Sequence, residues 1–178
     1  MRVVAGRLGG RRLAAPRGAA TRPTSDRVRE ALFAALGDVS GAEVLDLFAG
    51  SGALGIEALS RGAAHATFVD SAPAAVAAVR RNLAGLALED TAEVRRQDAR
   101  AFLRNARRAG RHYDLVFLDP PYRRAAALAA VLSQALPPVL APGARVVAES
   151  DRRAPLDLAL TLVDERRYGD TVIRVHGS

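Results

Sequence analysis

The stretch Leu45-Asp46-Leu47-Phe48-Ala49-Gly50-Ser51-Gly52-Ala53-Leu54-Gly55 decides the fold. It begins in an apolar run, VLDLF at 44–48, that is typical of a buried strand, and it continues into an Ala- and Leu-rich segment with helical spacing. Glycines let the backbone turn tightly and approach a ligand closely, and the helix after such a turn presents free N–H groups. The stretch therefore predicts a strand, a ligand-binding turn and a helix.

The alternation of strand and helix continues along the chain. Further apolar runs predict strands at 66–70, 92–98, 113–119 and 144–150, and the stretches between strands predict helices at 53–61, 73–87, 99–109 and 124–136. Such an alternation forms parallel βαβ units whose sheet is covered on both faces. Segments 158–167 and 171–177 flank a short turn and predict an antiparallel hairpin. The expected fold is α/β, with a mostly parallel sheet of about seven strands.

The first 30 residues carry nearly all of the excess positive charge. The chain of 178 residues has a formal net charge of +7, and its first 30 residues hold eight arginines against two acids. Segments 2–6 and 11–16 flank Gly9-Gly10 and predict a small hairpin. Compositional bias explains why every basic residue is Arg, but it does not explain the clustering. A basic patch on a nearly neutral body favours a polyanionic partner such as a nucleic-acid backbone.

Two ligands compete for the glycine loop. Gly50-x-Gly52-x-x-Gly55 matches the dinucleotide fingerprint, with Asp70 where a ribose-binding acid belongs. S-Adenosylmethionine uses more of the acids, because its cationic groups favour Asp46, its ribose favours Asp70 and its adenine amino group favours Asp98. All three acids fall at carboxyl ends of predicted strands, where open α/β sheets bind ligands. The structural alternative is that these acids only solubilise strand ends.

Asp119-Pro120-Pro121-Tyr122 ends the strand predicted at 113–119. The prolines stop the strand, but this structural interpretation leaves Asp119 and Tyr122 unexplained. A nucleobase amine is a poor nucleophile because its lone pair delocalises into the ring, and hydrogen bonds to the Asp119 carboxylate and the Pro120 carbonyl would draw it toward a tetrahedral amine. Tyr122 offers a face on which an extruded base stacks. The predicted catalytic set is Asp119, Pro120, Pro121 and Tyr122.

Other kinds of site find little support in the sequence. His65, His112 and His176 lack metal-ligand spacing and are expected at the surface or in loops, so no metal is expected. The absence of cysteine excludes disulfides and fits a reducing compartment. Without a signal peptide or an apolar run of membrane length, a soluble cytoplasmic protein is expected. Glu57, in the helix after the loop, is expected to face solvent or to cap a neighbour.

The front end of the chain carries a family resemblance. Arg2-Val3-Val4-Ala5-Gly6, Gly10-Arg11-Arg12-Leu13 and the run RPTSDRVREALF at 22–33, together with the loop and the Asp-Pro-Pro-Tyr motif, resemble the RsmD family of bacterial 16S ribosomal RNA guanine-N2 methyltransferases. The resemblance covers essentially the whole chain and includes Tyr168-Gly169-Asp170-Thr171. It implies a Rossmann-like class I methyltransferase fold with seven strands. It also implies methylation of a guanine in 16S rRNA, within an assembled or assembling small subunit.

The resemblance and the motifs together give the expected organisation. A basic N-terminal hairpin extension at 1–20 is expected to contact RNA, the methyltransferase domain is expected at 21–178, and a monomer is expected. Contacts to S-adenosylmethionine are expected from Asp46, Phe48, Gly50, Ser51, Gly52, Asp70, Ser71, Asp98 and Ala99. Contacts to RNA are expected from Arg2, Arg7, Arg11, Arg12, Arg22, Thr24 and Arg27.

Two other functions stay open. A DNA adenine-N6 methyltransferase would use the same loop and motif, although the chain has no room for a second domain that reads DNA. A catalytically idle RNA-binding module would retain the fold, although the presence of Asp46, Asp119 and Tyr122 together speaks against it. A protein glutamine methyltransferase usually has Asn in place of Asp119, and a nicotinamide oxidoreductase would need a proton donor and a second domain.

Overall fold

The computed structural model describes residues 1–16, 25–120 and 125–178. Its elements in chain order are η1 (Gly6–Leu8), α1 (Asp26–Leu36), β1 (Glu43–Leu47), α2 (Ala53–Ser60), β2 (His65–Asp70), α3 (Pro73–Leu86), η2 (Glu89–Thr91), β3 (Ala92–Arg96), α4 (Ala99–Arg108), β4 (Tyr113–Leu118), α5 (Ala125–Ala135), η4 (Pro137–Val139), β5 (Leu140–Asp151), β6 (Thr161–Tyr168) and β7 (Thr171–Gly177). The predicted strands and helices of residues 44–177 are confirmed, except that β3 ends earlier, β5 begins earlier and β6 begins later than expected. The hairpin predicted for 2–6 and 11–16 is reduced to a single bridge.

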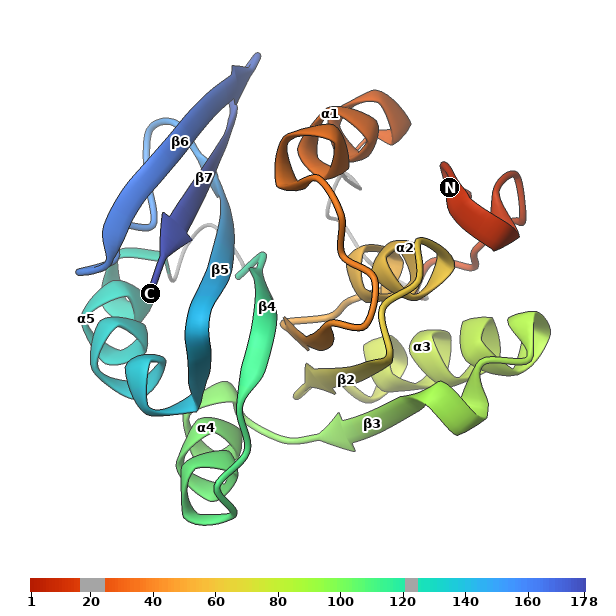
Figure 1. Cartoon of the computed structure of the whole chain (residues 1–178), viewed down its shortest axis with the longest axis horizontal. Coiled ribbons are helices and arrows are strands. Elements are labelled where there is room, and N and C mark those ends of the chain that lie inside the picture. Colours follow the sequence, from red (N-terminus) through yellow and green to blue (C-terminus); the bar gives the residue numbers. More distant parts are fainter. Residues whose placement is uncertain (17–24, 121–124) are drawn as a thin grey trace.

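Seven strands form one sheet in the order β3-β2-β1-β4-β5-β7-β6 (Figure 1). β1 pairs in parallel with β2 and with β4, whereas β7 runs antiparallel to β5 and β6. The chain moves outward from β1 to β3 and then returns to β4 on the other side of β1. Loops that leave β1 and β4 therefore diverge at a topological switch point, which is where open α/β sheets bind ligands.

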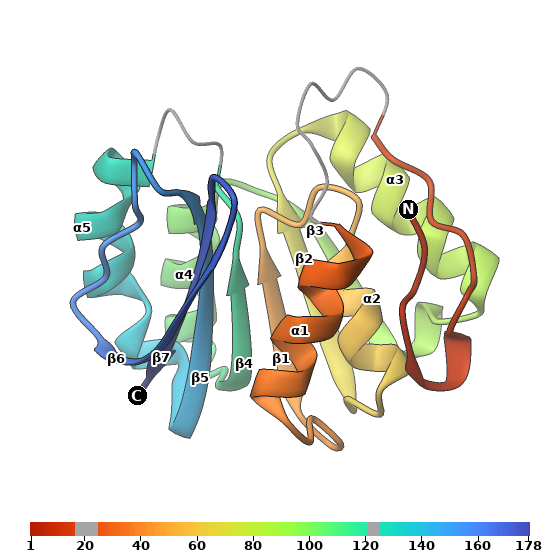
Figure 2. The ribbon, with the colours of Figure 1, turned by 90° about the horizontal axis from the view of Figure 1, so that it is seen from above.

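Helices cover both faces of the sheet and enclose two cores. Helices α1, α2 and α3 lie on one face, and α4 and α5 lie on the other (Figures 1 and 2). Strand side chains alternate between the cores, so that Val44 enters the first core while Leu45 and Leu47 enter the second. The same alternation places Asp46, between Leu45 and Leu47, on the face covered by α2.

Residues 1–16, here called the N-terminal arm, pack on α2 and α3. Arg2 and Arg12 form a single antiparallel bridge, and the short helix η1 lies between them. Val3 and Leu13 are buried in the first core. The arm is therefore part of the packed body, and the expected boundary at residue 20 lies outside the described residues.

Three polar side chains hold the backbone of the arm. Glu57 is fully buried and accepts the N–H groups of Val4 and Ala5, at 2.7 and 3.0 Å. Ser60 accepts from the N–H of Leu8, while the buried Asn82 on α3 makes reciprocal bonds with the backbone of residue 14. Polar groups that are buried in this way stabilise a fold when their hydrogen bonds are satisfied.

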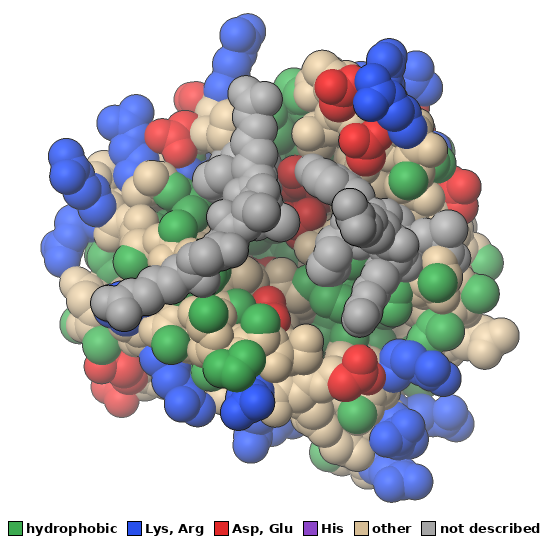
Figure 3. All heavy atoms as spheres, turned by 180° about the vertical axis from the view of Figure 1, so that it is seen from behind, with side chains coloured by type: hydrophobic (Ala, Val, Ile, Leu, Met, Phe, Trp, Pro, Cys, Tyr) green, Lys and Arg blue, Asp and Glu red, His purple; other side chains and the backbone are tan. Residues whose placement is uncertain are grey.

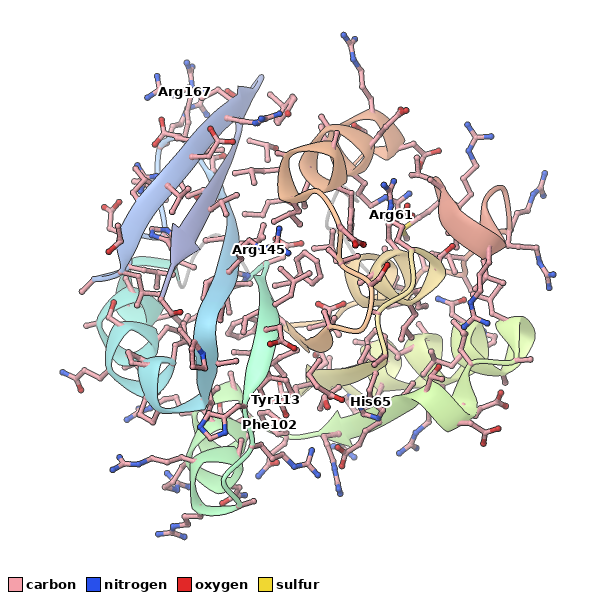
Figure 4. The ribbon with its side chains drawn as sticks, viewed as in Figure 1. Arg61, His65, Phe102, Tyr113, Arg145 and Arg167 are labelled. Atoms are coloured by element: carbon pink, nitrogen blue, oxygen red, sulfur yellow. The ribbon has the colours of Figure 1, made fainter. Side chains whose placement is uncertain are left out.

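The expectation for His176 is wrong, and so is the first of the two alternatives given for Glu57. Glu57 does not face solvent, because the arm covers it and the guanidinium of Arg61 pairs with it. That guanidinium, labelled in Figure 4, also lies over the ring of Phe33 on α1, with its central carbon 4.7 Å from the ring centre. His176 is buried on β7, with Nδ1 3.3 Å from the Leu160 carbonyl oxygen. Within residues 1–16, 25–120 and 125–178, no group of acids and histidines has the arrangement of a metal site, and no helix combines the length and apolar character of a membrane span.

Glu57→Ala should lower the free energy of unfolding by about 2–4 kcal/mol, because two backbone N–H groups of the arm and the Arg61 guanidinium lose their acceptor. Urea denaturation followed by circular dichroism measures this loss. Glu30→Ala, at an exposed position of α1, is the matched control and should change the free energy by less than about 0.5 kcal/mol. Losses of equal size in both variants would contradict an anchoring role for Glu57.

Candidate active site

The loop between β1 and α2 makes a strained turn against β2. Phe48 and Ala49 both donate their backbone N–H groups to the Val69 carbonyl oxygen, at 2.9 and 3.0 Å. Phe48 has a φ of +72°, in the left-handed region that residues with a side chain rarely adopt. Such strain clusters at functional sites, where the surrounding structure enforces it. The turn is therefore a candidate ligand-binding loop on structural grounds as well as from its sequence.

The glycines of this loop serve different purposes. Gly50 and Gly52 have φ values of +56° and +78°, and Gly52 is the residue that precedes the first turn of α2. Gly55 is required for packing, because an added Cβ would lie only 2.4 Å from the Phe68 ring. The glycine at 55 thus lets α2 approach β2 closely, and this positions the N-terminus of α2 above the loop.

Asp46 places a buried carboxylate beneath the loop. Its side chain is 3% exposed, and its Oδ2 accepts the N–H of Gly55 at 3.0 Å. Desolvation raises the pKa of Asp46 to about 7, the negative charge of Asp70 adds to this rise, and the bond from Gly55 opposes it. The site therefore holds an acid that favours a nearby positive charge.

Asp70 and Asp98 follow β2 and β3 and bond to the loops around them. Asp70 accepts the N–H of Gly50 at 2.9 Å through Oδ2, and the N–H of residue 72 through Oδ1. Asp98 caps α4 by accepting the N–H groups of Arg100 and residue 101 through Oδ1. Ser71 and Ala99 directly follow these acids, Ser71 being exposed and Ala99 buried in the second core.

Asp119 follows β4 on the same face of the sheet as Asp46. Its side chain keeps contact with solvent, yet the surrounding protein desolvates it and raises its pKa well above the ordinary value for an aspartate. The carboxylates of Glu149 and Asp46 raise that pKa further. Perturbed carboxylates of this kind are typical of functional sites. Pro120 is buried directly after Asp119.

These acids gather where the parallel strands end. Figure 3 shows that face of the molecule, with acidic side chains near its middle and arginines around its periphery. The structure also contains a cavity of about 380 Å³ beside Leu140, Thr161 and Gly177. This cavity lies at the amino end of β5, whereas the acids lie at the carboxyl ends of the strands. We therefore assign the candidate active site to the loops after β1, β2 and β4, and not to that cavity.

The predicted RNA-contacting arginines that the structure describes are all exposed, and Arg7 and Arg11 lie toward the C-terminal ends of α2 and α3, away from the glycine loop. Arg2 pairs with Asp26, and Arg11 donates to the Gly85 carbonyl oxygen. Arg7, Arg12 and Arg27 are exposed, and among the described residues their side chains make no hydrogen bond or ion pair. The arm reaches the loop directly, because Asn82 bonds both the Ala14 and the Ser51 carbonyl oxygens and the Met1 sulfur lies 3.5 Å from the Ser51 hydroxyl.

Four predicted site residues lie outside the described part of the chain, and three residues near the site were not predicted. Pro121, Tyr122, Arg22 and Thr24 lie outside the described residues. Glu149, Glu57 and Asn82 were not among the predicted site residues, although the structure places Glu149 beside Asp119 and connects the other two to the arm. A carboxylate at the end of the apolar run 144–150 was the available signal for Glu149.

The strand order with its antiparallel β7, the glycine loop after β1 and the Asp-Pro-Pro-Tyr motif after β4 define a class I methyltransferase fold. The chain belongs to the family described as conserved hypothetical protein 95, whose sequence model matches residues 1–177. The resemblance to the RsmD family is thereby confirmed.

Relatives and solved structures agree with this assignment. The chain is 40% identical to the putative rRNA methyltransferase YlbH of Bacillus subtilis, over 99% of this chain and 98% of that protein. It is 36% identical to ribosomal RNA small subunit methyltransferase D of Haemophilus influenzae, over 99% of this chain and 93% of that protein. The solved structure of the putative methyltransferase yhhF from Escherichia coli is 36% identical, with a TM-score of 0.82 and coverage of 99% and 97%.

Asp46→Asn should gain stability relative to the wild type as the pH rises. The pKa of Asp46 is about 7 in the folded protein and about 4 in the unfolded chain. Between pH 4 and pH 7 the unfolded chain has therefore lost a proton that the folded protein still binds. The free energy of unfolding of the wild type falls as the pH rises through this range. Asn carries no charge and keeps an acceptor for Gly55. Its advantage in the free energy of unfolding should grow by about 2–3 kcal/mol from pH 5 to pH 8.

Urea titrations of both proteins at pH 5 and pH 8 measure this growth. Asp114→Asn is the matched control, because Asp114 is exposed and also accepts a backbone N–H, from Glu43. An advantage of Asp46→Asn that stays constant with pH would show that burial does not perturb this carboxylate.

Proposed function

We propose that the protein transfers a methyl group from S-adenosylmethionine to the exocyclic N2 amine of a guanine in 16S rRNA. The observation that carries this proposal is the pair Asp46 and Asp119, which lie on one face of the sheet at the ends of β1 and β4, with Asp119 opening the Asp-Pro-Pro-Tyr motif. Relatives that are named rRNA methyltransferases and cover nearly the whole chain support the choice of substrate.

The residues of the loop fit this cofactor. When bound, S-adenosylmethionine supplies a methyl group on a cationic sulfur. Asp46 is buried with its pKa near 7, so a nearby cation would stabilise its ionised form and offset its desolvation. The strained backbone at Phe48 and the glycines at 50 and 52 leave room for close approach of a ligand. We assign cofactor contacts to Asp46, Phe48, Gly50, Ser51, Gly52, Asp70, Ser71, Asp98 and Ala99.

Asp119 would prepare the amine for reaction. Its carboxylate accepts a hydrogen bond from one N–H of the amine and the Pro120 carbonyl accepts the other, so that the nitrogen lone pair is withdrawn from the ring. The nitrogen then forms its bond to the methyl carbon as the carbon–sulfur bond breaks, and the surplus proton passes from the nitrogen to Asp119 or to water. Fixed geometry of the two reactants supplies much of the acceleration. Tyr122 provides the stacking surface and Pro121 the rigid link in this proposal.

RNA binding is assigned to the basic front end of the chain. Arg7, Arg12 and Arg27 are exposed and lie on the arm and on α1, while the arm itself contacts the glycine loop. Phosphate contacts from such arginines would orient the substrate without reading its sequence. We propose that a monomer acts in the cytoplasm on an assembled or assembling small subunit, with Arg2, Arg11, Arg22 and Thr24 as further contacts.

A transfer assay with labelled S-adenosylmethionine tests the proposal. The acceptors are small subunits from cells that lack this chain, their naked RNA, duplex DNA and bulk protein, and the products are digested to nucleosides. Label in N2-methylguanosine is the expected result, and its source shows whether assembly is required. Label in N6-methyladenine from DNA, or no label in any acceptor, would overturn the proposal.

Asp119→Ala should reduce the rate of methyl transfer by about 10²- to 10³-fold or more, because the amine loses a group that stabilises it in the transition state. Binding of S-adenosylmethionine, measured by titration calorimetry, should change little, since Asp119 belongs to the acceptor side of the site. An equal loss of donor binding and of transfer would instead mean that Asp119 has a structural role.

Replacing Arg7 and Arg12 by Gln should flatten the salt dependence of RNA binding. Each phosphate contact that is lost should lower the slope of log K against log salt by about 0.7–0.9, because fewer counterions are released. Substitution suits this test better than deletion of the arm, whose Val3 and Leu13 are part of the core.

Arg167→Gln is the matched control for this pair. Arg167 is exposed on β6, on the opposite side of the molecule from the arm (Figure 4). Filter binding across a series of salt concentrations gives the slopes, and an unchanged slope in the double variant would remove the arm from the RNA interface.

A further inference from the structure

We infer that Glu149 recognises the Watson–Crick edge of the target base and selects guanine over adenine. The inference rests on the proposed function and adds to it a residue that determines base specificity. Neither the Asp-Pro-Pro-Tyr motif nor the glycine loop contains Glu149. It lies instead at the carboxyl end of β5, next to the strand that carries Asp119.

The register of the sheet sets Glu149 beside Asp119. Leu118 on β4 pairs with Ala148 on β5, so the next residues along these parallel strands are Asp119 and Glu149. Neighbouring strands lie about 4.8 Å apart, which brings the two carboxylates within reach of one small ring. Phe117 and Val147 both enter the first core, and the alternation of strand side chains places Asp119 and Glu149 on that same face.

The backbone around Glu149 is fixed on both sides. β5 pairs with β4 on one side, and Glu149 itself pairs with Ile173 of β7 on the other. Its side chain is only 5% exposed, whereas Asp119 remains open to solvent. A carboxylate held on a rigid strand at this depth is suited to reading one edge of a base that has entered the site. Its charge also acts on Asp119, whose pKa it raises in addition to the larger effect of desolvation.

The chemistry of the bases distinguishes guanine at such a pair. Guanine presents two adjacent donors, N1–H and the N2 amine, and two neighbouring carboxylates can accept from both. Adenine presents its N6 amine beside N1, which is an acceptor, so a second carboxylate would face a lone pair. A site with buried groups that hydrogen-bond the correct base rejects an analogue that leaves them unpaired. Asp119 therefore engages the reacting amine and Glu149 engages N1–H.

The test replaces the target guanine by 2,6-diaminopurine, which keeps the 2-amino group but has an acceptor at N1. Small subunits are reconstituted with ligated 16S rRNA that carries either base at the position that the wild-type protein methylates. The ratio of kcat/KM for guanine to kcat/KM for diaminopurine is then measured. We expect the wild type to prefer guanine by about tenfold or more.

Glu149→Gln should reduce this preference by about tenfold, because the amide can turn its NH₂ group toward the N1 acceptor of diaminopurine. A residue with a merely structural role would lower both rates together and leave the ratio unchanged. Glu43→Gln, at the amino end of β1 and half-exposed, is the matched control and should leave the ratio as in the wild type.

Each outcome separates this inference from the proposed function. Transfer to guanine N2 with no preference over diaminopurine in the wild type would overturn the inference and leave the function standing, and this arm requires no variant to fold. A preference that Glu149→Gln does not alter, in a protein that still binds S-adenosylmethionine, would also overturn it. If guanine N2 receives no methyl group in the wild type, both the function and the inference fail.

Discussion

The hydrogen bond from the Gly55 N–H to the buried carboxylate of Asp46 joins the end of β1 to the first turn of α2, and much of the structure depends on it. It sets the depth at which α2 lies on the sheet, which the missing side chain at Gly55 makes possible beside Phe68. From that position α2 presents Glu57 and Ser60 to the N-terminal arm. The same carboxylate faces the ends of the neighbouring strands and contributes to the electrostatics of Asp119. One buried acid thus connects the loop, the arm and the catalytic motif.

The order of the elements and the position of several candidate site residues at strand ends could be predicted from the sequence because these depend on local patterns. Apolar runs that end in an acid revealed β1 and β4 together with Asp46 and Asp119, and glycine spacing revealed the turn between β1 and α2. Glu57 could not be predicted, since its partners Val4 and Ala5 lie 53 and 52 residues away in the chain. The roles of such residues depend on long-range packing, which no local period encodes.

Register explains why Glu149 was missed although its neighbour Asp119 was found. Both residues end apolar strands, but only Asp119 is followed by the conspicuous Pro-Pro-Tyr sequence. That β4 and β5 are neighbours follows from the βαβ alternation, whereas the pairing of Leu118 with Ala148 requires the three-dimensional structure. On its other side, Glu149 pairs with Ile173 of β7, and its side chain is buried. The carboxylates of Asp46 and Glu149 both raise the pKa of Asp119, and perturbed carboxylates of this kind are typical of functional sites.

Asn82 links the N-terminal arm to the glycine loop through hydrogen bonds. Its side-chain amide makes two hydrogen bonds with the backbone of Ala14 and a third with the Ser51 carbonyl oxygen. A displacement of either segment therefore disturbs a buried amide that the other segment also uses. Free-energy coupling between two binding surfaces is reciprocal. Under the proposed function, Asn82 is the side chain through which binding at the loop and binding at the arm would influence each other.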